Sequence, residues 1–277
     1  MILLFSSCVV ASTLLTVASG AECNQARMLQ FAHGLVDAQN VGSLGNLEGA
    51  NPHNLTYLEN NKTMEITSGV LRNALHVDHN RTITDLIECA SYTEMIMTNR
   101  ASPHVVGTQV RHDPDNDMLV YLVDSVVSTT GSWLFNASKT LEWVRKEDWS
   151  MIPAGERDSR KALKDAADAY LDMWSNKSAI DAVPWGTPCA RLEGSAYTGN
   201  GSPTDSCKPG IPTNNNQAPN INRRYVIDES FGSVDVINIF QHLSNAPDSH
   251  EFRMVKGKLR YIHTMTIASS GAMPPVM

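Results

Sequence analysis

Apolar and polar residues alternate along the C-terminal stretch, in two runs that cover residues 247–255 and 258–266. Alternation with a period of two is typical of β-strands, and Lys256-Gly257 between the runs favours a two-residue hairpin turn. The largely apolar face of this hairpin would carry His250, Phe252, Met254, Leu259, Tyr261 and His263, with the two histidines opposite each other. We interpret this face as the wall of a binding cavity. The competing interpretation is that both histidines are ordinary half-buried core residues.

The rest of the pattern predicts two similarly ordered halves, residues 21–150 and 151–277, which no sequence repeat relates. Apolar residues at helical spacing predict helices over residues 24–38, 82–96 and 158–175. Strand patterns cover residues 104–112, 118–127, 141–144, 183–194, 223–228 and 233–240. This order predicts an α+β fold in which helices pack against curved antiparallel sheets. A sheet that curves around a helix leaves a conical cavity, which is a common kind of small-molecule site.

The N-terminal residues 1–20 have the pattern of a secretory signal. Residues 2–18 are uncharged and apolar, and small residues near Gly20 and Ala21 would allow cleavage. Six Asn-x-Ser/Thr sequons, at Asn54, Asn61, Asn80, Asn136, Asn176 and Asn200, fit a glycosylated surface. No later segment is apolar enough to span a bilayer. We therefore expect the protein in the lumen of the secretory pathway or outside the cell.

Cysteine usage agrees with that compartment. Cys8 would leave with the signal, and the four remaining cysteines would form two disulfides in an oxidising environment. The simplest of the three connectivities joins Cys23 to Cys89 and Cys189 to Cys207. A zinc site is the alternative, but the chain has no Cys-x-x-Cys spacing.

Charge and motifs narrow the function classes. The chain of 277 residues has a formal net charge of −7 and no basic stripe, which argues against a nucleic-acid partner. It also lacks a Gly-x-Ser-x-Gly elbow, a His-Glu-x-x-His motif, a dinucleotide glycine fingerprint and a P-loop. Serine hydrolases, metalloproteases and nicotinamide or flavin oxidoreductases are therefore disfavoured, and we expect neither a metal nor a cofactor.

Several short segments resemble a family of secreted fungal proteins with a SnoaL-like, NTF2-like C-terminal domain. The likeness covers residues 185–267 and rests on Arg191-Leu-Glu-Gly, Tyr197-Thr-Gly, Asp205-Ser-Cys207, Arg223-Arg-Tyr-Val, Pro247-Asp-Ser-His-Glu-Phe-Arg253 and Gly257-Lys-Leu-Arg-Tyr-Ile-His-Thr-Met265. Members often have a cysteine soon after the His-Thr-Met segment, where this chain has Ile267-Ala-Ser-Ser. By overall likeness, the chain is similar to the hetero-Diels–Alderases of fungal tropolone-sesquiterpenoid pathways.

This resemblance implies a cofactor-independent cycloaddition between a tropolone-derived ortho-quinone methide and a humulene-type alkene. Such a reaction needs apolar small-molecule substrates held in reacting geometry and a donor on the quinone-methide oxygen. The candidate donors are His250, His263 and Arg191. The candidate walls of the substrate site are Trp185, Tyr225, Phe252, Tyr261 and Met254. A homodimer is also compatible with the sequence.

Two other functions remain open. A SnoaL-like cyclase or isomerase would transfer a proton with a His–Asp pair, formed by His250 or His263 with Asp248 or Asp228. A secreted carrier without catalytic activity would need only the apolar cavity.

Overall fold

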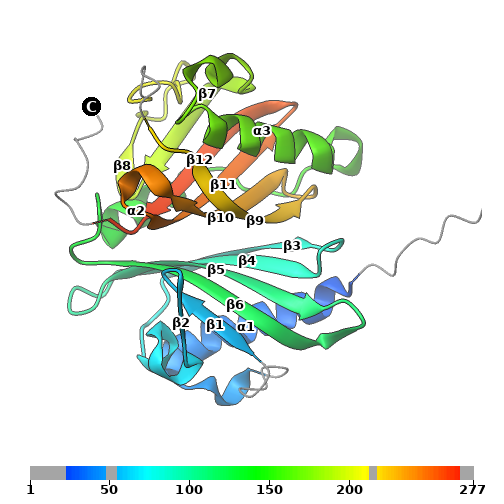
Figure 1. The fold of residues 1–277 in the computed structure, drawn as a ribbon, viewed down its shortest axis with the longest axis vertical. Helices are drawn as coiled ribbons and strands as arrows, with labels where there is room; N and C mark the ends of the chain where they lie inside the picture. The colour runs from blue at the N-terminus through cyan, green and yellow to red at the C-terminus, as the bar shows by residue number, and fades with distance from the viewer. Residues whose placement is uncertain (1–22, 48–54, 212–216, 269–277) are drawn as a thin grey trace, which may run out of the picture.

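The computed structural model describes residues 23–47, 55–211 and 217–268, and in this part of the chain two six-stranded sheets lie face to face between two helices. Figure 1 shows the layers in order as α1, the first sheet, the second sheet and α3. The fold is thus α+β with curved sheets, as predicted. The predicted signal segment and the sequon at Asn54 lie outside the described residues.

The first half begins with helix α1, Gln25–Val41. The Asn24 side chain accepts a hydrogen bond from the Arg27 backbone N–H at its start, and Gly42, with φ 67°, ends it. The strands of this half are β1 Thr56–Glu59, β2 Lys62–Met64, β3 His79–Asp85, β4 Ala90–Met97, β5 His104–Asp113 and β6 Asn116–Thr129. A short 3₁₀ helix, η1 Leu44–Asn46, lies between α1 and β1, and two more, η2 Ile66–Ser68 and η3 Val70–Arg72, lie between β2 and β3.

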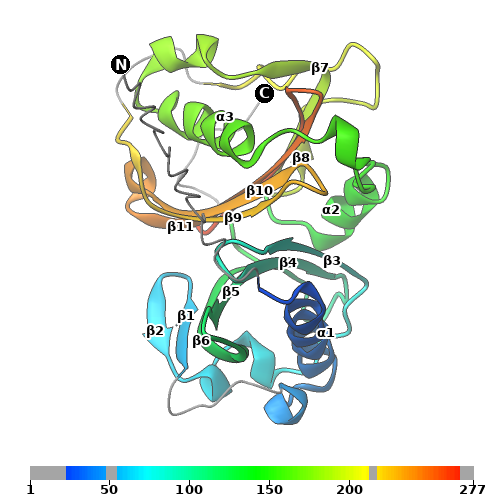
Figure 2. The same ribbon diagram turned by 90° about the vertical axis from the view of Figure 1, so that its right-hand side faces the viewer.

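The second half repeats this plan after two helices, α2 Ala137–Val144 and α3 Arg160–Asp172. Its strands are β7 Trp185–Glu193, β8 Ala196–Tyr197, β9 Asn220–Asp228, β10 Ser233–Phe240, β11 Ala246–Val255 and β12 Lys258–Thr266. The short 3₁₀ helices of this half are η4 Ala154–Glu156, η5 Lys177–Asp181 and η6 Gln241–Leu243. Figure 2 shows the second sheet curving around α3, as the first curves around α1.

The two sheets have the same topology. Their strand orders are β2-β1-β6-β5-β4-β3 and β8-β7-β12-β11-β10-β9, so that adding six to each strand number of the first sheet gives the second. Each sheet is an antiparallel four-strand meander whose last strand pairs in parallel with a short hairpin, as β6 does with β1 and β12 with β7. The sheets are therefore mixed: four strands of each are antiparallel, as predicted, and one parallel pairing in each sheet was not predicted.

The core consists of three apolar layers. Aliphatic residues including Leu35, Val110 and Val123 fill the space between α1 and the first sheet. Tyr92, Val226 and Met265 belong to the layer between the sheets, which α2 extends. The third layer lies between α3 and the second sheet and contains most of the aromatic core residues. We call the side of the second sheet toward α3 its α3 face, and the opposite side its inter-sheet face.

Side chains from the first half cover the outer edge of β9, the last strand of its sheet. The Asp85 Oδ2 accepts a hydrogen bond from the Ile227 backbone N–H, and the Asp228 Oδ2 accepts one from the Thr84 backbone N–H, both at 2.9 Å. Gln109 and Arg111 donate to the backbone carbonyls of Arg224 and Tyr225. The exposed row of backbone groups that an edge strand normally presents is thus satisfied by side chains.

Both predicted disulfides are present, Cys23–Cys89 and Cys189–Cys207. They fit the predicted oxidising compartment. Among the described residues, no helix is both long and apolar enough to cross a membrane.

Two predicted elements differ from the structure. Residues 82–96 do not form a helix but belong to β3 and β4 and the turn that joins them. All eight residues of β4 are buried, so its two apolar faces merge into a run without alternation, which resembles a helix in sequence. Residues 141–144 were predicted as a strand and instead end the helix α2, whose eight residues are too few for a clear period.

The register of the C-terminal hairpin is the third correction. Val255 pairs with Lys258 and Met254 with Leu259, as predicted, but Arg253 then pairs with Tyr261. Arg260 is thus an extra residue, a β-bulge, and every later residue of β12 changes face. His263 pairs with Glu251 and not with His250, so the predicted cross-strand histidine pair was wrong.

Candidate functional site

Two rows of side chains cross the α3 face of the second sheet. The pairings of five strands place Tyr225, Val236, His250, Thr264 and Glu193 in one row. The neighbouring row contains Ile227, Val234, Phe252, Ile262 and Arg191. Because adjacent strands lie about 4.8 Å apart, each row spans roughly 19 Å across a surface that α3 covers. A largely apolar surface with a few polar groups is the usual composition of a small-molecule site.

Tyr170 of α3 lies over the centre of this surface. It belongs to the apolar stripe of the helix, whose start is capped by the Ser159 side chain accepting from the Ala162 backbone N–H. The Tyr170 ring lies 5.1 Å from the Phe252 ring, 5.6 Å from the His250 ring and 6.0 Å from the Trp185 ring, measured between centroids. These spacings and tilts are those of favourable aromatic contacts. One helical residue therefore connects three residues that the sequence singled out.

His250 and Asp248 form a buried pair on β11. Two residues apart on one strand, they point to the same face, and the His250 Nδ1 lies 2.7 Å from the Asp248 Oδ2. Asp248 also accepts hydrogen bonds from the Asn238 amide and the Thr266 hydroxyl, at 2.8 and 2.6 Å. Asp248 is thereby fixed in place and orients the imidazole, as carboxylates do behind functional histidines.

Burial disfavours the charged form of His250, but Asp248 outweighs it, so the pKa of His250 is raised above its usual value. The sign of this shift favours the imidazolium, with Nε2 as a donor. Among the described residues no protein atom is a hydrogen-bond partner of the His250 Nε2, although this atom is buried. A buried donor without a protein partner is a feature that calls for an explanation, and a ligand oxygen is one.

Arg191 is the cation of this surface and has no exposed area. Its Nη1 lies 3.1 Å from the Tyr170 hydroxyl and 3.2 Å from the Glu193 Oε1, and its Nη2 donates to the Pro209 carbonyl at 2.5 Å. Burial disfavours its charge, but Tyr170 and Glu193 outweigh burial and raise the Arg191 pKa. Burial also raises the Tyr170 pKa, so the hydroxyl stays a neutral donor. The α3 face therefore carries three polar groups that can donate hydrogen bonds: an imidazole, a guanidinium and a phenol.

The segment after β8 covers one end of this surface. Cys207 and Ile211 are buried in the same apolar layer as Tyr170, and the disulfide ties Cys207 to β7. The Pro209 carbonyl accepts the Arg191 hydrogen bond. The segment thus closes over the donors, and a disulfide and several hydrogen bonds to β7 hold it, among them one from the Cys189 backbone N–H to the Asp205 carbonyl at 2.9 Å.

The structure brings together most of the predicted site residues. His250, Arg191, Trp185, Tyr225, Phe252 and Met254 all belong to the α3 face and its apolar layer. His263 and Tyr261 do not, because the bulge at Arg260 turns them to the inter-sheet face. Tyr170 was not among the predicted site residues, although it lies in the helix predicted over residues 158–175. A phenol in an otherwise apolar helical stripe was a usable signal, since a buried hydroxyl needs a polar partner.

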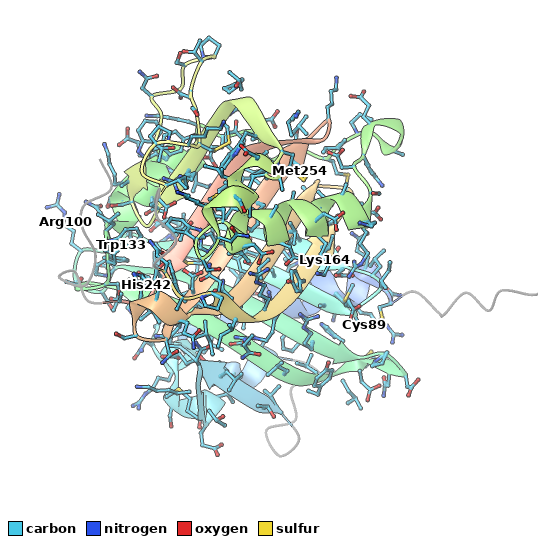
Figure 3. All side chains as sticks on the ribbon, turned by 45° about the horizontal axis from the view of Figure 1, so that its top comes forward. Cys89, Arg100, Trp133, Lys164, His242 and Met254 are labelled. Carbon is cyan, nitrogen blue, oxygen red and sulfur yellow. A yellow bond between two sulfur atoms is a disulfide. The ribbon has the colours of Figure 1, made fainter. Side chains whose placement is uncertain are left out.

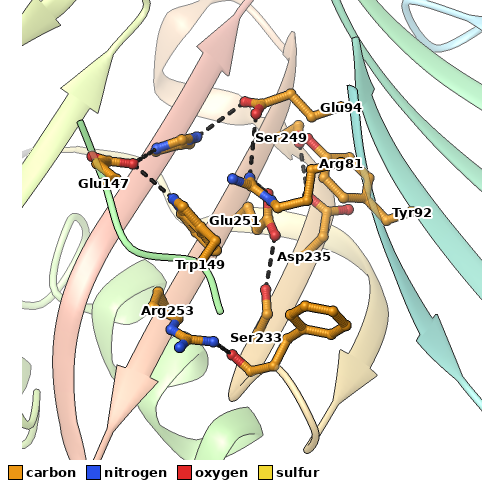
Figure 4. Close-up of polar contacts among 12 residues, drawn as sticks. Arg81, Tyr92, Glu94, Glu147, Trp149, Ser233, Asp235, Ser249, Glu251 and Arg253 are labelled. Atoms are coloured by element: carbon orange, nitrogen blue, oxygen red, sulfur yellow. Dashed lines mark hydrogen bonds and ion pairs between the residues drawn. The ribbon is translucent and has the colours of Figure 1, made fainter. Parts of the chain in front are cut away.

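His263 belongs instead to a charged network on the inter-sheet face. Its Nδ1 lies 3.0 Å from the Glu94 Oε1 and its Nε2 lies 2.5 Å from the Glu147 Oε2. Arg81 contacts Glu94 and Glu251, at 3.2 and 2.5 Å. Figure 4 shows this network, with Arg81 between Glu94 and Glu251. Its members come from both halves, so the network joins the two sheets.

Opposite charges stabilise the ionised state of this network. Burial disfavours the His263 imidazolium, but Glu147 and Glu94 outweigh burial and raise the His263 pKa to about 10. Burial likewise opposes ionisation of Glu94, and His263 and Arg81 still lower its pKa to about 2. Glu94, Glu251 and His263 offer ligand atoms within 4.8 Å of one another, a spacing that could hold a metal ion. Arg81 already supplies a cation to both carboxylates, so we interpret the cluster as an ion-pair network.

The fold and the α3 face define the class of protein: a four-layer α+β protein with a buried, aromatic-lined set of donors in its second half. Residues 156–266 match a family model described as a domain of unknown function, DUF8021. The match covers fewer than half of the 277 residues and contains α3 and all strands of the second sheet. No curated protein matches the chain.

Proposed function

We propose that the α3 face binds an apolar small molecule and catalyses a hetero-Diels–Alder cycloaddition between a tropolone-derived ortho-quinone methide and a humulene-type alkene. The observation that carries the proposal is the buried His250 Nε2, which has no hydrogen-bond partner among the described residues and lies beside the rings of Tyr170 and Phe252. Asp248 raises the His250 pKa and so favours the protonated ring, in which Nε2 donates. The overall likeness of the chain to the fungal hetero-Diels–Alderases supports the choice of substrates. We also propose that the protein is secreted and that its second half is a SnoaL-like cone.

The reaction requires little chemistry from the protein. The heterodiene, a conjugated C=C–C=O unit, adds across the alkene, one C–C and one C–O bond form together, and no group leaves. Holding both partners in reacting geometry supplies at most about 7–11 kcal/mol of the barrier. A hydrogen bond to the heterodiene oxygen withdraws electron density and stabilises the charge that develops there. The His250 imidazolium, with the Tyr170 hydroxyl and the Arg191 guanidinium nearby, provides such donors.

The residues are buried, so both substrates must replace contacts that now fill the site. The segment around Pro209 and Ile211 is a candidate for movement, because beyond the disulfide at Cys207 it meets Arg191 through the Pro209 carbonyl and α3 through apolar packing. Phe252 and Trp185 would form the steric walls that choose which alkene face reacts. We therefore expect these walls to control the stereoisomer ratio, and the donors to control the rate.

The test incubates the purified protein with a quinone-methide precursor and a humulene-type alcohol and compares rate and stereoisomer distribution with a boiled sample. His250→Gln should lower the rate about 10²–10³-fold, as loss of an oxyanion-hole donor does. The control is His242→Gln, since His242 is exposed on η6. Identical products and rates with native and boiled protein would contradict the proposal. Binding of the substrates without turnover would then identify a carrier.

A second candidate function is a proton transfer of the cyclase or isomerase kind. The His250–Asp248 contact of 2.7 Å favours it, because a carboxylate that orients an imidazole is the arrangement of many general bases. The two functions have opposite pH profiles. A donor needs the imidazolium, so activity falls as pH rises through the raised His250 pKa; a base needs the neutral ring, so activity rises over the same range.

A further inference from the structure

A second cleft lies where the two halves meet, at the outer edge of β9. It has a volume of about 500 Å³ and is lined from the first half by Arg111, Tyr121 and Leu122. From the second half it is lined by residues of α3 and β9, among them Lys164, Tyr225 and Ile227. Lys164, labelled in Figure 3, belongs to α3, and its Nζ lies 4.3 Å from the centre of the Tyr225 ring. The cleft shares the Tyr225 side chain with the site around His250, but the donors described above do not line it.

The lining of this cleft is strongly basic in a chain whose net charge is −7. Five of its residues are cationic, Arg111, Arg160, Lys164, Arg223 and Arg224, and one, Glu88, is acidic. Four of the cations have carboxylate partners at 2.6–2.8 Å, which Asp85, Asp124, Asp168 and Asp172 provide. In the part of the chain that the structure describes, Arg111 forms no such ion pair.

Arg111 is held by neutral acceptors instead. Its Nη2 donates to the Gln109 Oε1 at 3.0 Å and to the Tyr225 carbonyl at 2.7 Å. These two bonds fix the guanidinium and leave its Nε and Nη1 donors without a partner among the described protein atoms. Burial is the largest influence on Arg111 and lowers its pKa, and it outweighs the opposite effects of Tyr121, Asp85 and Glu88. A guanidinium remains charged in proteins even so.

We propose that this cleft binds an oxyanion carried on a planar apolar body, with the anion on Arg111 and the body against Tyr121 and Leu122. The free edge of a guanidinium matches the two oxygens of a carboxylate or phosphate. The Tyr121 side chain is 48% exposed, and Leu122 lies next to it on β6. A ligand with an aromatic ring would cover this exposed surface. The proposal does not depend on the chemistry at His250.

The experiment measures binding of three probes to the full chain by calorimetry: benzoate, phenyl phosphate and inorganic phosphate. We expect saturable binding of both aromatic probes at one site per chain. Arg111→Gln should weaken the binding of all three probes by about 10- to 100-fold, because it removes a pair of charge-assisted hydrogen bonds. Arg100→Gln is the matched control, since Arg100 is exposed and lies on the other side of the view from Lys164 in Figure 3.

Arg111 also binds the edge of β9, so its removal could disturb the fold. Tyr121→Ser avoids this difficulty because Tyr121 is half exposed. This variant should bind benzoate and phenyl phosphate about tenfold more weakly than the wild type and should bind inorganic phosphate equally well. Two results would overturn the proposal. The first is that no probe binds the wild type saturably, even at probe concentrations about ten times those of ordinary buffers. The second is that the wild type and Tyr121→Ser bind the aromatic probes equally well.

Discussion

Tyr170 is the residue on which the geometry of the α3 face depends most. Its ring contacts His250, Phe252 and Trp185, and its hydroxyl meets Arg191. The rings alone would leave the cluster free to repack, because apolar contacts have little directional preference. The hydroxyl adds direction, since it fixes the helix rotation relative to β7.

Replacing Tyr170 with Phe tests this positioning role. The variant keeps the ring contacts and removes one partner of the buried Arg191 guanidinium, which should lower the free energy of unfolding by about 1–3 kcal/mol. Thermal or urea unfolding measures this loss. Trp185→Phe is a control that shortens a neighbouring ring and leaves the Arg191 contact in place. Unchanged stability of Tyr170→Phe would show that the hydroxyl contact adds nothing.

His263 should make stability depend on pH. Its pKa of about 10 exceeds the usual 6.5, so its contribution is fully present below about pH 6.5 and is lost as pH rises through 10. Glu94 has the opposite sign: its contribution is present above about pH 4.5 and is lost as pH falls toward 2. His263→Gln should lower the free energy of unfolding by about 3–5 kcal/mol near pH 6, since it leaves buried carboxylates unpaired.

The measurement for His263 is a series of unfolding curves between pH 5 and pH 10. The difference in free energy of unfolding between the wild type and His263→Gln should shrink steadily as pH rises from about 6.5 to 10. His242→Gln, at an exposed position, should parallel the wild type throughout. A difference that stayed constant up to pH 10 would mean that His263 is not charged in the folded protein.

Among the described sequons, Asn61 differs from the rest. Asn80, Asn136, Asn176 and Asn200 are exposed, whereas the Asn61 Nδ2 is buried and its Oδ1 accepts from Arg224 at 3.3 Å. Glycan transfer needs an accessible Nδ2. Expression through a eukaryotic secretory pathway and glycopeptide mapping should therefore find glycans at exposed sequons and Asn61 unmodified. A high glycan occupancy at Asn61 would contradict the buried position.

At the scale of elements, the sequence predicted what regular spacing encodes. Helices α1 and α3, the strands β5 and β6, and the three strands β9, β10 and β11 lie where the patterns placed them. β4 was missed because burial on both faces removes alternation, and α2 because eight residues show too little periodicity. The bulge was invisible for another reason. Arg260 fits the alternation of β12 as well as any residue, and its pairing is decided by contacts with β7 and β11.

The same bulge explains how much of the site could be predicted. Residues of β11 were assigned to the correct face, because no irregularity separates His250 from Phe252 and Met254. Tyr261 and His263 follow the bulge, so one extra residue transferred both from the proposed site to the inter-sheet network. Asp248 was among the acid–base alternatives, but the contact with His250 depends on rotamers that a sequence does not encode.

Deleting Arg260 should test the bulge directly. A strand without the extra residue would pair Met254 with Leu259 and Arg253 with Tyr261 in regular alternation, so His263 would stay on the inter-sheet face with its contacts to Glu94 and Glu147. We expect the deletion variant to unfold cooperatively in circular dichroism melts. Arg260→Ala keeps the backbone and removes a half-buried side chain over the Tyr261 ring, so it should lower the free energy of unfolding by about 1 kcal/mol or less. Loss of cooperative unfolding in the deletion variant would contradict this register.

At the scale of the molecule, the two halves have one topology but different interiors. The space under α1 is filled by aliphatic residues such as Leu35 and Val110. The space under α3 contains His250, Arg191 and several aromatic rings. Hydrophobic patterns predicted two similar halves, since both interiors follow the same periods. They could not predict that buried ion pairs would join the otherwise apolar inter-sheet faces, because these pairs connect residues far apart in sequence, such as Arg81 and Glu251.

The second half should not remain a monomer when it is produced alone. Residues 151–277 would expose Leu192, Val226, Ile237 and Met265, which now pack between the sheets. Each large aliphatic side chain gains about 1.5–3 kcal/mol from burial, so the fragment should associate through this face. Light scattering coupled to size exclusion would show dimers or larger species, compared with the full chain. A monodisperse monomer of the fragment would mean that the inter-sheet layer is dispensable.

The covering of the β9 edge by Asp85, Gln109 and Arg111 has a consequence for long-term storage and for expression yield. While the halves are docked, this edge cannot accept a strand from another molecule, so the folded protein is protected from cross-β polymerisation there. The protecting side chains belong to the opposite half. Any transient separation would therefore uncover a strand template and an apolar sheet face in one event, and fibril formation should begin from that opened state rather than from the unfolded chain.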